Sequence, residues 1–514
     1  MNGVTRRPGP VVLLVILGAL YLPWTWSDQL ASLGGDSAVY LLSARVYAPH
    51  LPPDPVAKGI ADQSQFPPLY PALLAATGGA TDLRLAHAIT TVCLLAAFAA
   101  CYASLLAMGL PRGLALATTA LFAVMPGTIQ QALQLKSEGL YLALTLAALT
   151  LLSRASATRQ PAAYWTAAGL VAAALLTRSA GLALLPALVL VLLRDRPRAW
   201  YGMLALSLLP FGAWTLLRQP DHSYGDALLA YAQAPAAAIA RQLAGNLEAL
   251  AWGLGANVLQ TRPLLWVLVP VALVSAAVLV WRFCRWYVDA WYIAAYLALI
   301  VLWPYPSEAQ RFGWVVMPWL LGYAVLAADR GAARFSNRPG VVQSAIRWSG
   351  PAVLALLIAP SFLIAAQRRV HAATQETPAL AQLPEWYGAD PVAARAEAQL
   401  HLDMARAMQE LGRQVPEGEC VISIKPATVT FYSGRESFVP PFDDVDDGAF
   451  RAGLDAARCR YVLLLAATQP PQYPEPYYPK ERLGERLEIV EVRTSSRDDS
   501  RRVVAALGRL VEGR

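Results

Sequence analysis

Charged side chains are scarce in this sequence of 514 residues. Asp, Glu, Lys and Arg together make up 15% of it, whereas hydrophobic residues make up 56%. A typical soluble domain carries about 25% charged residues, so this composition excludes an ordinary soluble globular protein. The mean hydropathy of +0.40 agrees. We therefore expect that most of the chain is buried in a lipid bilayer.

Several motifs that carry chemistry in other proteins are also missing. The five His residues show no ligand spacing, and the sequence has neither a Gly-rich phosphate loop nor a Cys metal cluster. The net charge is +7, but most Arg residues stand in short loops between apolar runs, which is typical of membrane proteins. We therefore expect membrane lipid as a partner and no nucleic acid.

The charge that is present is unevenly distributed. Long runs without Lys, Arg, Asp or Glu fill the first 366 positions, and the chain after Ala366 is densely charged. The sequence therefore predicts two domains, a transmembrane module at 1–366 and a soluble α/β domain at 367–514.

A bilayer core of about 30 Å requires about 20 helical residues. By that measure the module contains about eleven transmembrane helices. The apolar runs begin near Val11, His87, Gly113, Gly139, Ala162, Ala180, Trp200, Pro263, Val288, Phe312 and Gly350. The first run follows Arg6 and Arg7, but it lacks a small-x-small cleavage site and ends at Trp24 and Trp26, so we interpret it as a permanent anchor.

The positions of the arginines predict the orientation. With a cytoplasmic N-terminus, every inner loop carries Arg, in agreement with the positive-inside rule. These residues are Arg6, Arg7, Arg112, Arg154, Arg159, Arg194, Arg196, Arg198, Arg282, Arg285, Arg330, Arg334, Arg338 and Arg347. An odd number of crossings then places the C-terminal domain outside. We expect a multi-pass protein of the bacterial inner (plasma) membrane with a periplasmic or extracellular C-terminal domain.

The cysteines fit that orientation. Cys93, Cys101 and Cys284 fall in or beside apolar runs, whereas Cys420 and Cys459 lie in the external domain. An oxidising compartment allows one disulfide between the last two. Two buried free thiols are the alternative.

Residues 162–193 are apolar except around Arg178, and one helix of that length would be far longer than the membrane is thick. We predict two antiparallel helices with Arg178 at the turn, below the outer surface in a cavity open to water. There the guanidinium would be available to an anion. The alternative is that Arg178 only snorkels to the headgroups.

The outer loops gather carboxylates and cations on one membrane face. The first, from about residue 27 to 86, suits short helices that lie in the interface. The polar residues of interest are Asp36, Tyr40 and Lys58, with Tyr70 in a Pro-Pro-Leu-Tyr-Pro segment; Lys136, Ser137 and Glu138; and Glu308 and Arg311.

These segments resemble the GT-C superfamily of membrane glycosyltransferases, which contains protein mannosyltransferases and the aminoarabinose transferase that modifies lipid A. The matching pieces are Asp36 with Tyr40, the Pro67-Pro68-Leu69-Tyr70-Pro71 segment, Ser137 to Tyr141, Leu176 to Gly181, and Arg311-Phe312 leading to Met317-Pro318. The resemblance covers about residues 1–330. It leaves the sugar and the acceptor open, because the first outer loop has Gln65-Phe66 and Asp36-Ser37 where the two named groups have other residues.

The resemblance implies an inverting transfer of a sugar from a polyprenyl-phosphate-linked donor to an acceptor on the outer face. Such a reaction needs a base at the acceptor hydroxyl and positive charge at the departing phosphate. The catalytic candidates are Asp36 and Glu138, which would also share a divalent metal. The phosphate candidates are Arg311, Arg178 and Lys136, and the substrate-positioning candidates are Tyr40, Lys58 and Tyr70.

Each of these residues also has a structural interpretation. Asp36 after Gly34-Gly35 is placed to cap the next helix, and Glu138 suits the first turn of a helix. Lys136 and Tyr40 would mark the interface, and Arg311 would only pair with Glu308. Two other functions stay open. A polysaccharide polymerase or ligase would use the same donor, and a lipid-sugar transporter or flippase would show related halves, which we do not see.

The C-terminal domain alternates helical and strand patterns. We predict helices at Pro391–Gln414, Ala427–Ser433 and Ala449–Arg458, and strands at Cys420–Ile424, Tyr461–Leu465, Leu487–Arg493 and Arg502–Leu507. Nothing in this domain looks catalytic.

Overall fold

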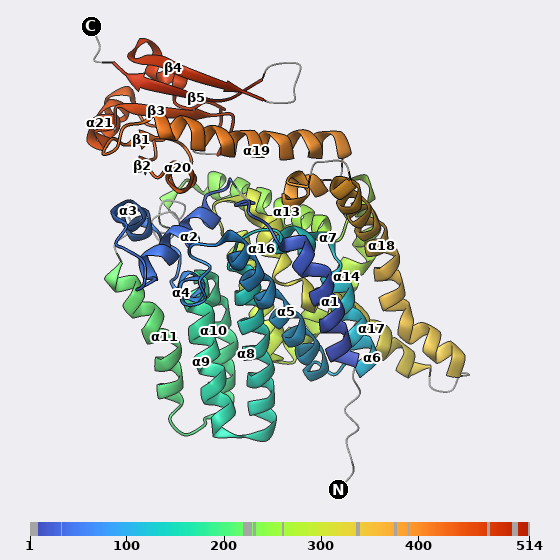
Figure 1. Ribbon diagram of the computed structural model, residues 1–514. Helices are drawn as coiled ribbons and strands as arrows, with labels where there is room; N and C mark the ends of the chain where they lie inside the picture. Colours follow the sequence, from blue (N-terminus) through green and yellow to red (C-terminus); the bar gives the residue numbers. More distant parts are fainter. Residues whose placement is uncertain are drawn as a thin grey trace. The chain divides into compact units, whose positions relative to one another are not determined.

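The computed structural model describes residues 9–31, 33–218, 229, 233–259, 262–335, 340–374, 378–388, 390–469, 473–495 and 502–511 (Figure 1). Arg6, Arg7 and Arg338 of the predicted inner loops lie outside these residues. The chain forms two compact units. Unit 1 comprises Met1–Trp26, Gln65–Tyr70 and Arg84–Ala373, and unit 2 comprises Ser27–Ser64, Pro71–Leu83 and Thr374–Arg514. Most of the first outer loop therefore belongs to the same unit as the C-terminal segment.

Unit 1 is helical throughout the part that the structure describes. Its elements are α1 (Gly9–Thr25), α5 (Leu83–Ala107), α6 (Arg112–Ala123), α7 (Pro126–Ala132), α8 (Glu138–Thr158), α9 (Pro161–Thr177), η1 (Ser179–Ala183), α10 (Leu184–Asp195), α11 (Trp200–Leu217), α13 (Ala236–Val258), η2 (Arg262–Leu268), α14 (Val269–Cys284), α15 (Val288–Val301), η3 (Pro306–Glu308), α16 (Ala309–Trp314), α17 (Met317–Arg334) and α18 (Gly340–Thr374). A helix lies in each of the eleven predicted apolar runs. α4 (Leu69–Ala76) extends from one unit into the other.

The protein is a multi-pass membrane protein. Within the described residues, five helices are long and apolar enough to cross a membrane, or up to seven if each of two bent pairs, α6 with α7 and η3–α16 with α17, is one span. α1, α9 and α15 are shorter apolar helices. Many apolar side chains face outward, including Leu216, Leu217 and Leu356, which only a lipid environment would accommodate at low cost. The count of eleven crossings stays a prediction.

The predicted break at Arg178 is present. α9 ends at Thr177, Arg178 has an extended backbone, and the chain continues through η1 into α10. α8 packs against α9, and Arg159 after α8 forms an ion pair of 2.9 Å with Asp195 at the end of α10. The ends of α8 and α10 therefore lie at the same end of the unit, as Figure 1 shows. Glu138 is the first residue of α8 and therefore lies at the other end of that helix.

Unit 2 is an α/β unit. Its helices are α2 (Asp36–Tyr47), α3 (Pro55–Gln63), η4 (Leu380–Gln382), η5 (Pro384–Tyr387), α19 (Pro391–Gln414), α20 (Pro426–Ser433), α21 (Asp447–Ala457), α22 (Lys480–Leu483) and η6 (Gly484–Arg486). Its strands are β1 (Val421–Ile422), β2 (Ser437–Phe438), β3 (Tyr461–Leu465), β4 (Leu487–Thr494) and β5 (Val503–Leu510).

The five strands form one sheet in the order β2-β1-β3-β5-β4. β2, β1 and β3 are parallel, whereas β5 pairs antiparallel with β3 and β4. The apolar side chains of α19 pack with those of β3 and β5 in a common core. A disulfide joins Cys420, just before β1, to Cys459, just before β3. Its formation in the cell stays a prediction that depends on the compartment.

Candidate active site

Glu138 lies at the centre of a buried ionic cluster in unit 1. Its carboxylate is only 2% exposed. The Nη1 atom of Arg178 lies 2.6 Å from the Glu138 Oε1 atom, and Nε of Arg311 donates a hydrogen bond to the same oxygen. Because α8 and α9 pack side by side, the start of α8 meets the end of α9, and this brings Glu138 and Arg178 together. Nη1 of Arg178 also donates to Oγ of Ser137 at 3.5 Å.

Arg311 reaches the cluster from α16, which α13 holds in place. The side-chain amide of Asn257 in α13 donates to the carbonyl oxygen of Gln310 at 2.8 Å. Gly253, one turn earlier, lies so close to α16 that a Cβ atom there would come within 2.6 Å of the Gln310 nitrogen. The residue next to Arg311 is therefore fixed by a helix from another part of the chain.

Phe312 lies against both guanidinium groups. The Cζ atom of Arg178 is 5.3 Å from the centre of its ring, and that of Arg311 is 5.6 Å from it. Contacts of this kind attract a cation to an aromatic face and orient its plane. The ring and the Glu138 carboxylate therefore hold the two guanidinium groups in defined positions.

Three cations, Arg178, Arg311 and Lys136, lie around Glu138. Glu308 is a second carboxylate, whose Oε2 atom lies 3.0 Å from Nη1 of Arg311. The guanidinium side chains are only 11% and 13% exposed, so water screens them poorly. Such a site favours a bound anion.

A divalent metal shared by Glu138 and Asp36 stays a prediction. Both guanidinium groups contact Oε1 of Glu138, whereas its buried Oε2 atom has no hydrogen-bond partner among the described residues. Among the residues that the structure describes, no group of three or more His, Cys, Asp or Glu side chains is arranged to hold a metal ion. We derive no step through a metal.

The other predicted residues belong to other helices. Asp36 and Tyr40 are in α2 and Lys58 is in α3, all in unit 2. Tyr40 is buried, and Lys58 forms an ion pair with Asp62 on the same helix. Tyr70, in unit 1, is buried, and its hydroxyl lies 2.7 Å from that of Thr90. A role of Tyr40, Lys58 and Tyr70 in positioning substrate stays a prediction.

Asp36 is not the capping residue of its helix. The N-cap position of α2 is occupied by Gly35, whose φ of 96° suits a residue without a side chain. Asp36 follows in the first turn, where the helix dipole favours a negative charge. Its side chain is half-buried. The interpretation of Asp36 as a helix cap is therefore wrong.

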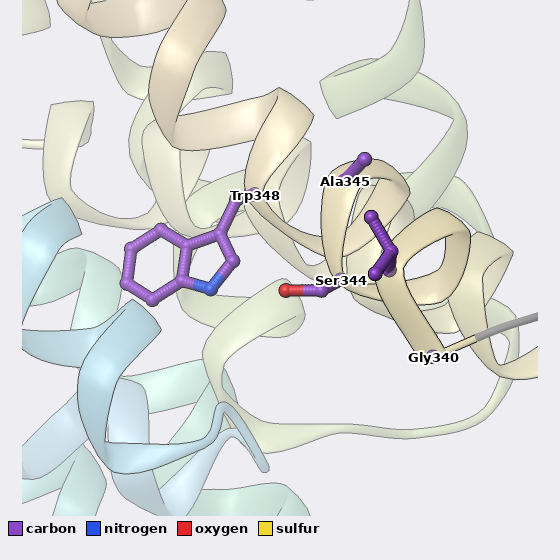
Figure 2. A pocket seen from close by; sticks show the side chains of 5 residues that line it. Gly340, Ser344, Ala345 and Trp348 are labelled. Atoms are coloured by element: carbon purple, nitrogen blue, oxygen red, sulfur yellow. The ribbon is translucent and has the colours of Figure 1, made fainter.

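A surface hollow at the start of α18 is not part of this cluster. Gly340, Val341, Ser344, Ala345 and Trp348 line it. Figure 2 shows Trp348 and Ser344 on neighbouring turns of that helix. No predicted site residue lines it, and most of its lining is apolar.

Comparisons with known proteins identify the fold. No family model matches the sequence, and no curated protein matches it either. The crystal structure of ArnT from Cupriavidus metallidurans in the apo state is similar over 97% of this chain and 98% of that chain, with a TM-score of 0.53 and 14% identity. The chain has the GT-C fold. The fold that the sequence resemblance implied is therefore confirmed.

Two further solved structures are similar at a lower score. ArnT from the same organism bound to undecaprenyl phosphate has 13% identity and a TM-score of 0.49 over 97% of this chain and 98% of that chain. The Archaeoglobus fulgidus oligosaccharyltransferase in complex with Zn and sulfate has 14% identity and a TM-score of 0.49, over 88% of this chain and 67% of that chain. At such identities the likeness concerns the fold.

Within this GT-C fold the structure adds residues that the sequence did not suggest. The sequence shows Phe312 only as a neighbour of Arg311 at the start of an apolar run, and its contact with two cations depends on the break after α9. Asn257 and Gly253 lie in an Ala-rich stretch where nothing marks them as important. A Gly and an Asn four residues apart on one helix were the available signal, because such a pair permits a close helix contact with a hydrogen bond across it.

Proposed function

We propose that this protein is a membrane glycosyltransferase that moves a sugar from a polyprenyl-phosphate-linked donor to a cell-envelope acceptor on the outer face of the membrane. The observation that carries the proposal is the buried cluster of two guanidinium groups, those of Arg178 and Arg311, around Glu138. A phosphate is the anion that suits two oriented guanidinium groups best, because it accepts several parallel hydrogen bonds. The GT-C fold supports the same proposal.

The proposed reaction is a direct displacement at the anomeric carbon. The acceptor hydroxyl oxygen forms the new bond to that carbon, and the bond from the carbon to the donor phosphate oxygen breaks. The phosphate leaves with the bonding electron pair, and its added negative charge is stabilised by Arg178, Arg311 and Lys136. The acceptor proton passes to the carboxylate of Asp36. Inversion of the anomeric configuration follows from a single displacement.

Glu138 has a different part in this proposal from the one expected from the sequence. A carboxylate in contact with two guanidinium groups is stabilised in its ionised form, which makes it a poor base. We assign it to stabilising the buried charges of Arg178 and Arg311 while the site is empty. Asp36 remains the candidate base.

The proposal is tested by incubating the purified protein with candidate polyprenyl-phosphate sugars and identifying the released lipid and the glycosylated product. Arg178→Gln and Arg311→Gln should each weaken donor binding by about 1.5 to 3 kcal/mol, which is about 10- to 150-fold, because each removes a charge-assisted contact. The matched control is Arg159→Gln, which removes an exposed charge at the other end of α8 from Glu138 and should leave donor binding unchanged.

Wild-type donor affinity in both variants would show that the phosphate binds elsewhere. The reaction product distinguishes the proposed transferase from the related functions. A single added sugar on a non-polymeric acceptor supports the transferase, a lengthening or block-transferred glycan supports a polymerase or ligase, and movement of intact donor across vesicles without release of lipid supports a transporter.

A further inference from the structure

The segment that carries Asp36 is attached to α20 in unit 2. α2 packs against α3 and α20, and α3 also contacts α20. α20 follows β1 and precedes β2, and those two strands pair in parallel. α20 is therefore part of the crossover that builds the sheet. The first outer loop, nearly 400 residues earlier in the chain, is thus packed against a framework element of the C-terminal segment.

Three contacts fix this attachment. The guanidinium of Arg45 in α2 lies 5.1 Å from the centre of the Phe431 ring in α20. The backbone of Leu30 forms a hydrogen bond with Tyr432, the next residue of α20, and burial raises the pKa of that phenol to about 12. Leu33 packs against the apolar core between α19 and the sheet.

These contacts surround Asp36 along the chain. Leu30 and Leu33 precede it, and Arg45 follows it in the same helix. Leu30 itself is fully buried, and the hydroxyl of Ser27 donates to the side-chain oxygen of Gln382 at 2.9 Å. The residues before and after Asp36 therefore both contact the C-terminal part of unit 2, and the position of Asp36 depends on the packing of α20.

We infer that the C-terminal segment is a positioning device for the catalytic acid, and that Phe431 and Tyr432 are the positioning residues through which α20 holds α2 and Asp36. The inference rests on the proposed function for the chemical role of Asp36. The attachment itself rests on the contacts alone. A displacement of a catalytic group by about 1 Å lowers turnover by up to about a hundredfold. Donor binding by Arg178 and Arg311, which belong to other elements, should keep its affinity.

The experiment uses the full-length protein with Phe431→Leu, which removes the ring beneath Arg45, and Phe431→Tyr, which restores a ring. We expect Phe431→Leu to accelerate amide hydrogen exchange in α2 and to lower turnover by about tenfold to a hundredfold, with an unchanged dissociation constant for the donor lipid. Phe431→Tyr should restore both the exchange pattern and the turnover.

Phe450→Leu is the matched control. Phe450 is a buried ring of the same unit and also lies beneath a guanidinium, that of Arg482 at 4.1 Å, but its contacts are with α22 and the sheet core. It should lower the stability of unit 2 more than Phe431→Leu does, and leave the exchange of α2 and the turnover of the folded protein unchanged.

Unchanged exchange of α2 in Phe431→Leu would overturn the attachment. Accelerated exchange with wild-type turnover would overturn the positioning role, and so would an equal loss of turnover in Phe450→Leu. If the wild-type protein transfers no sugar but α2 exchange accelerates in Phe431→Leu alone, the proposed function fails and the attachment of α2 to α20 stands.

Discussion

Asp36 is the residue on which the proposed chemistry depends most directly. It is half-buried in the first turn of α2, behind Gly35 at the cap position. Asn at this position keeps the size of the side chain and its hydrogen-bonding oxygen, but it cannot take up a proton at neutral pH. We predict that Asp36→Asn folds normally and loses about two to four orders of magnitude in turnover, as general-base loss does.

The comparison is with Asp28→Asn, an exposed acid of the same unit. Both variants should show wild-type thermal unfolding, and only Asp36→Asn should be inactive in the transfer assay. Turnover within about tenfold of wild type in Asp36→Asn would remove this residue from the mechanism.

Glu138 leads to a second prediction, because its partners are two arginines that are almost fully buried. Glu138→Gln keeps the shape and removes the negative charge that Arg178 and Arg311 share, while Arg311 keeps its contact with Glu308. Breaking a buried ion pair costs about 3 to 5 kcal/mol. We therefore expect a lower unfolding temperature for Glu138→Gln in the absence of ligand.

A bound phosphate would supply the missing negative charge. A polyprenyl phosphate should therefore raise the unfolding temperature of Glu138→Gln by more than it raises that of the wild type. Glu308→Gln is the control, since Glu308 is 40% exposed and its loss should cost less than about 1 kcal/mol. Equal shifts on lipid addition in wild type and Glu138→Gln would mean that the phosphate does not bind at this cluster.

The packing of α13 on α16 determines where Arg311 lies. A Cβ atom at Gly253 would come within 2.6 Å of the Gln310 nitrogen and 2.8 Å of its Cα, and neither backbone atom can rotate away. Gly253→Ala should therefore separate the two helices and cost about 1 to 3 kcal/mol of stability. We predict weaker donor binding as well, because Arg311 follows Gln310.

Gly245 on the same helix is the control position. No heavy atom lies within 4 Å of a Cβ atom placed there, so Gly245→Ala should stabilise the protein by up to about 1 kcal/mol through helix propensity. Thermal unfolding and donor titration of the two variants measure both effects. Wild-type donor affinity in Gly253→Ala would contradict the proposed dependence of Arg311 on α13.

The elements that could be predicted from the sequence are those with a strong local pattern. The predicted bounds Pro391–Gln414 and Tyr461–Leu465 are those of α19 and β3, because an amphipathic helix and a short apolar run flanked by polar residues mark them. β2 was missed, since two residues at Ser437–Phe438 show no periodicity and become a strand only by pairing with β1.

The candidate site was predicted in part for a similar reason. Four charged residues stand next to apolar runs: Lys136, Glu138, Arg178 and Arg311. Burying a charge there is costly, so a charged residue without a function is rare. The pairing of both arginines with one carboxylate depends on the packing of α8, α9 and α16, which no local pattern records. The same holds for α2 and α20, whose contact joins two distant parts of the sequence.

The orientation of the membrane helices determines which side of the membrane the Glu138 cluster faces. The proposed reaction requires that it face the side on which the donor is presented. Arg159 and Asp195 tie together the α8–α9 and α10–α11 connections, and Figure 1 shows the start of α1 at the same end of unit 1. The Glu138 cluster lies at the other end of α8. If arginine-rich connections are cytoplasmic, this cluster faces outward, where a polyprenyl-linked sugar is presented after it crosses the membrane.

This orientation is tested by fusing a reporter enzyme that is active only outside the cytoplasm. We predict activity for the fusion after Arg514 and none for the fusion after Asn337, because α18 between those points is long and apolar enough to cross the membrane once. Oxidation of Cys420 and Cys459 in protein taken from cells without reductant provides a second measurement, since the pair is joined only in an oxidising compartment. Activity of the Asn337 fusion together with freely alkylatable Cys420 and Cys459 would reverse the orientation, and the cluster around Glu138 would then face nucleotide-bound sugars and not lipid-linked ones.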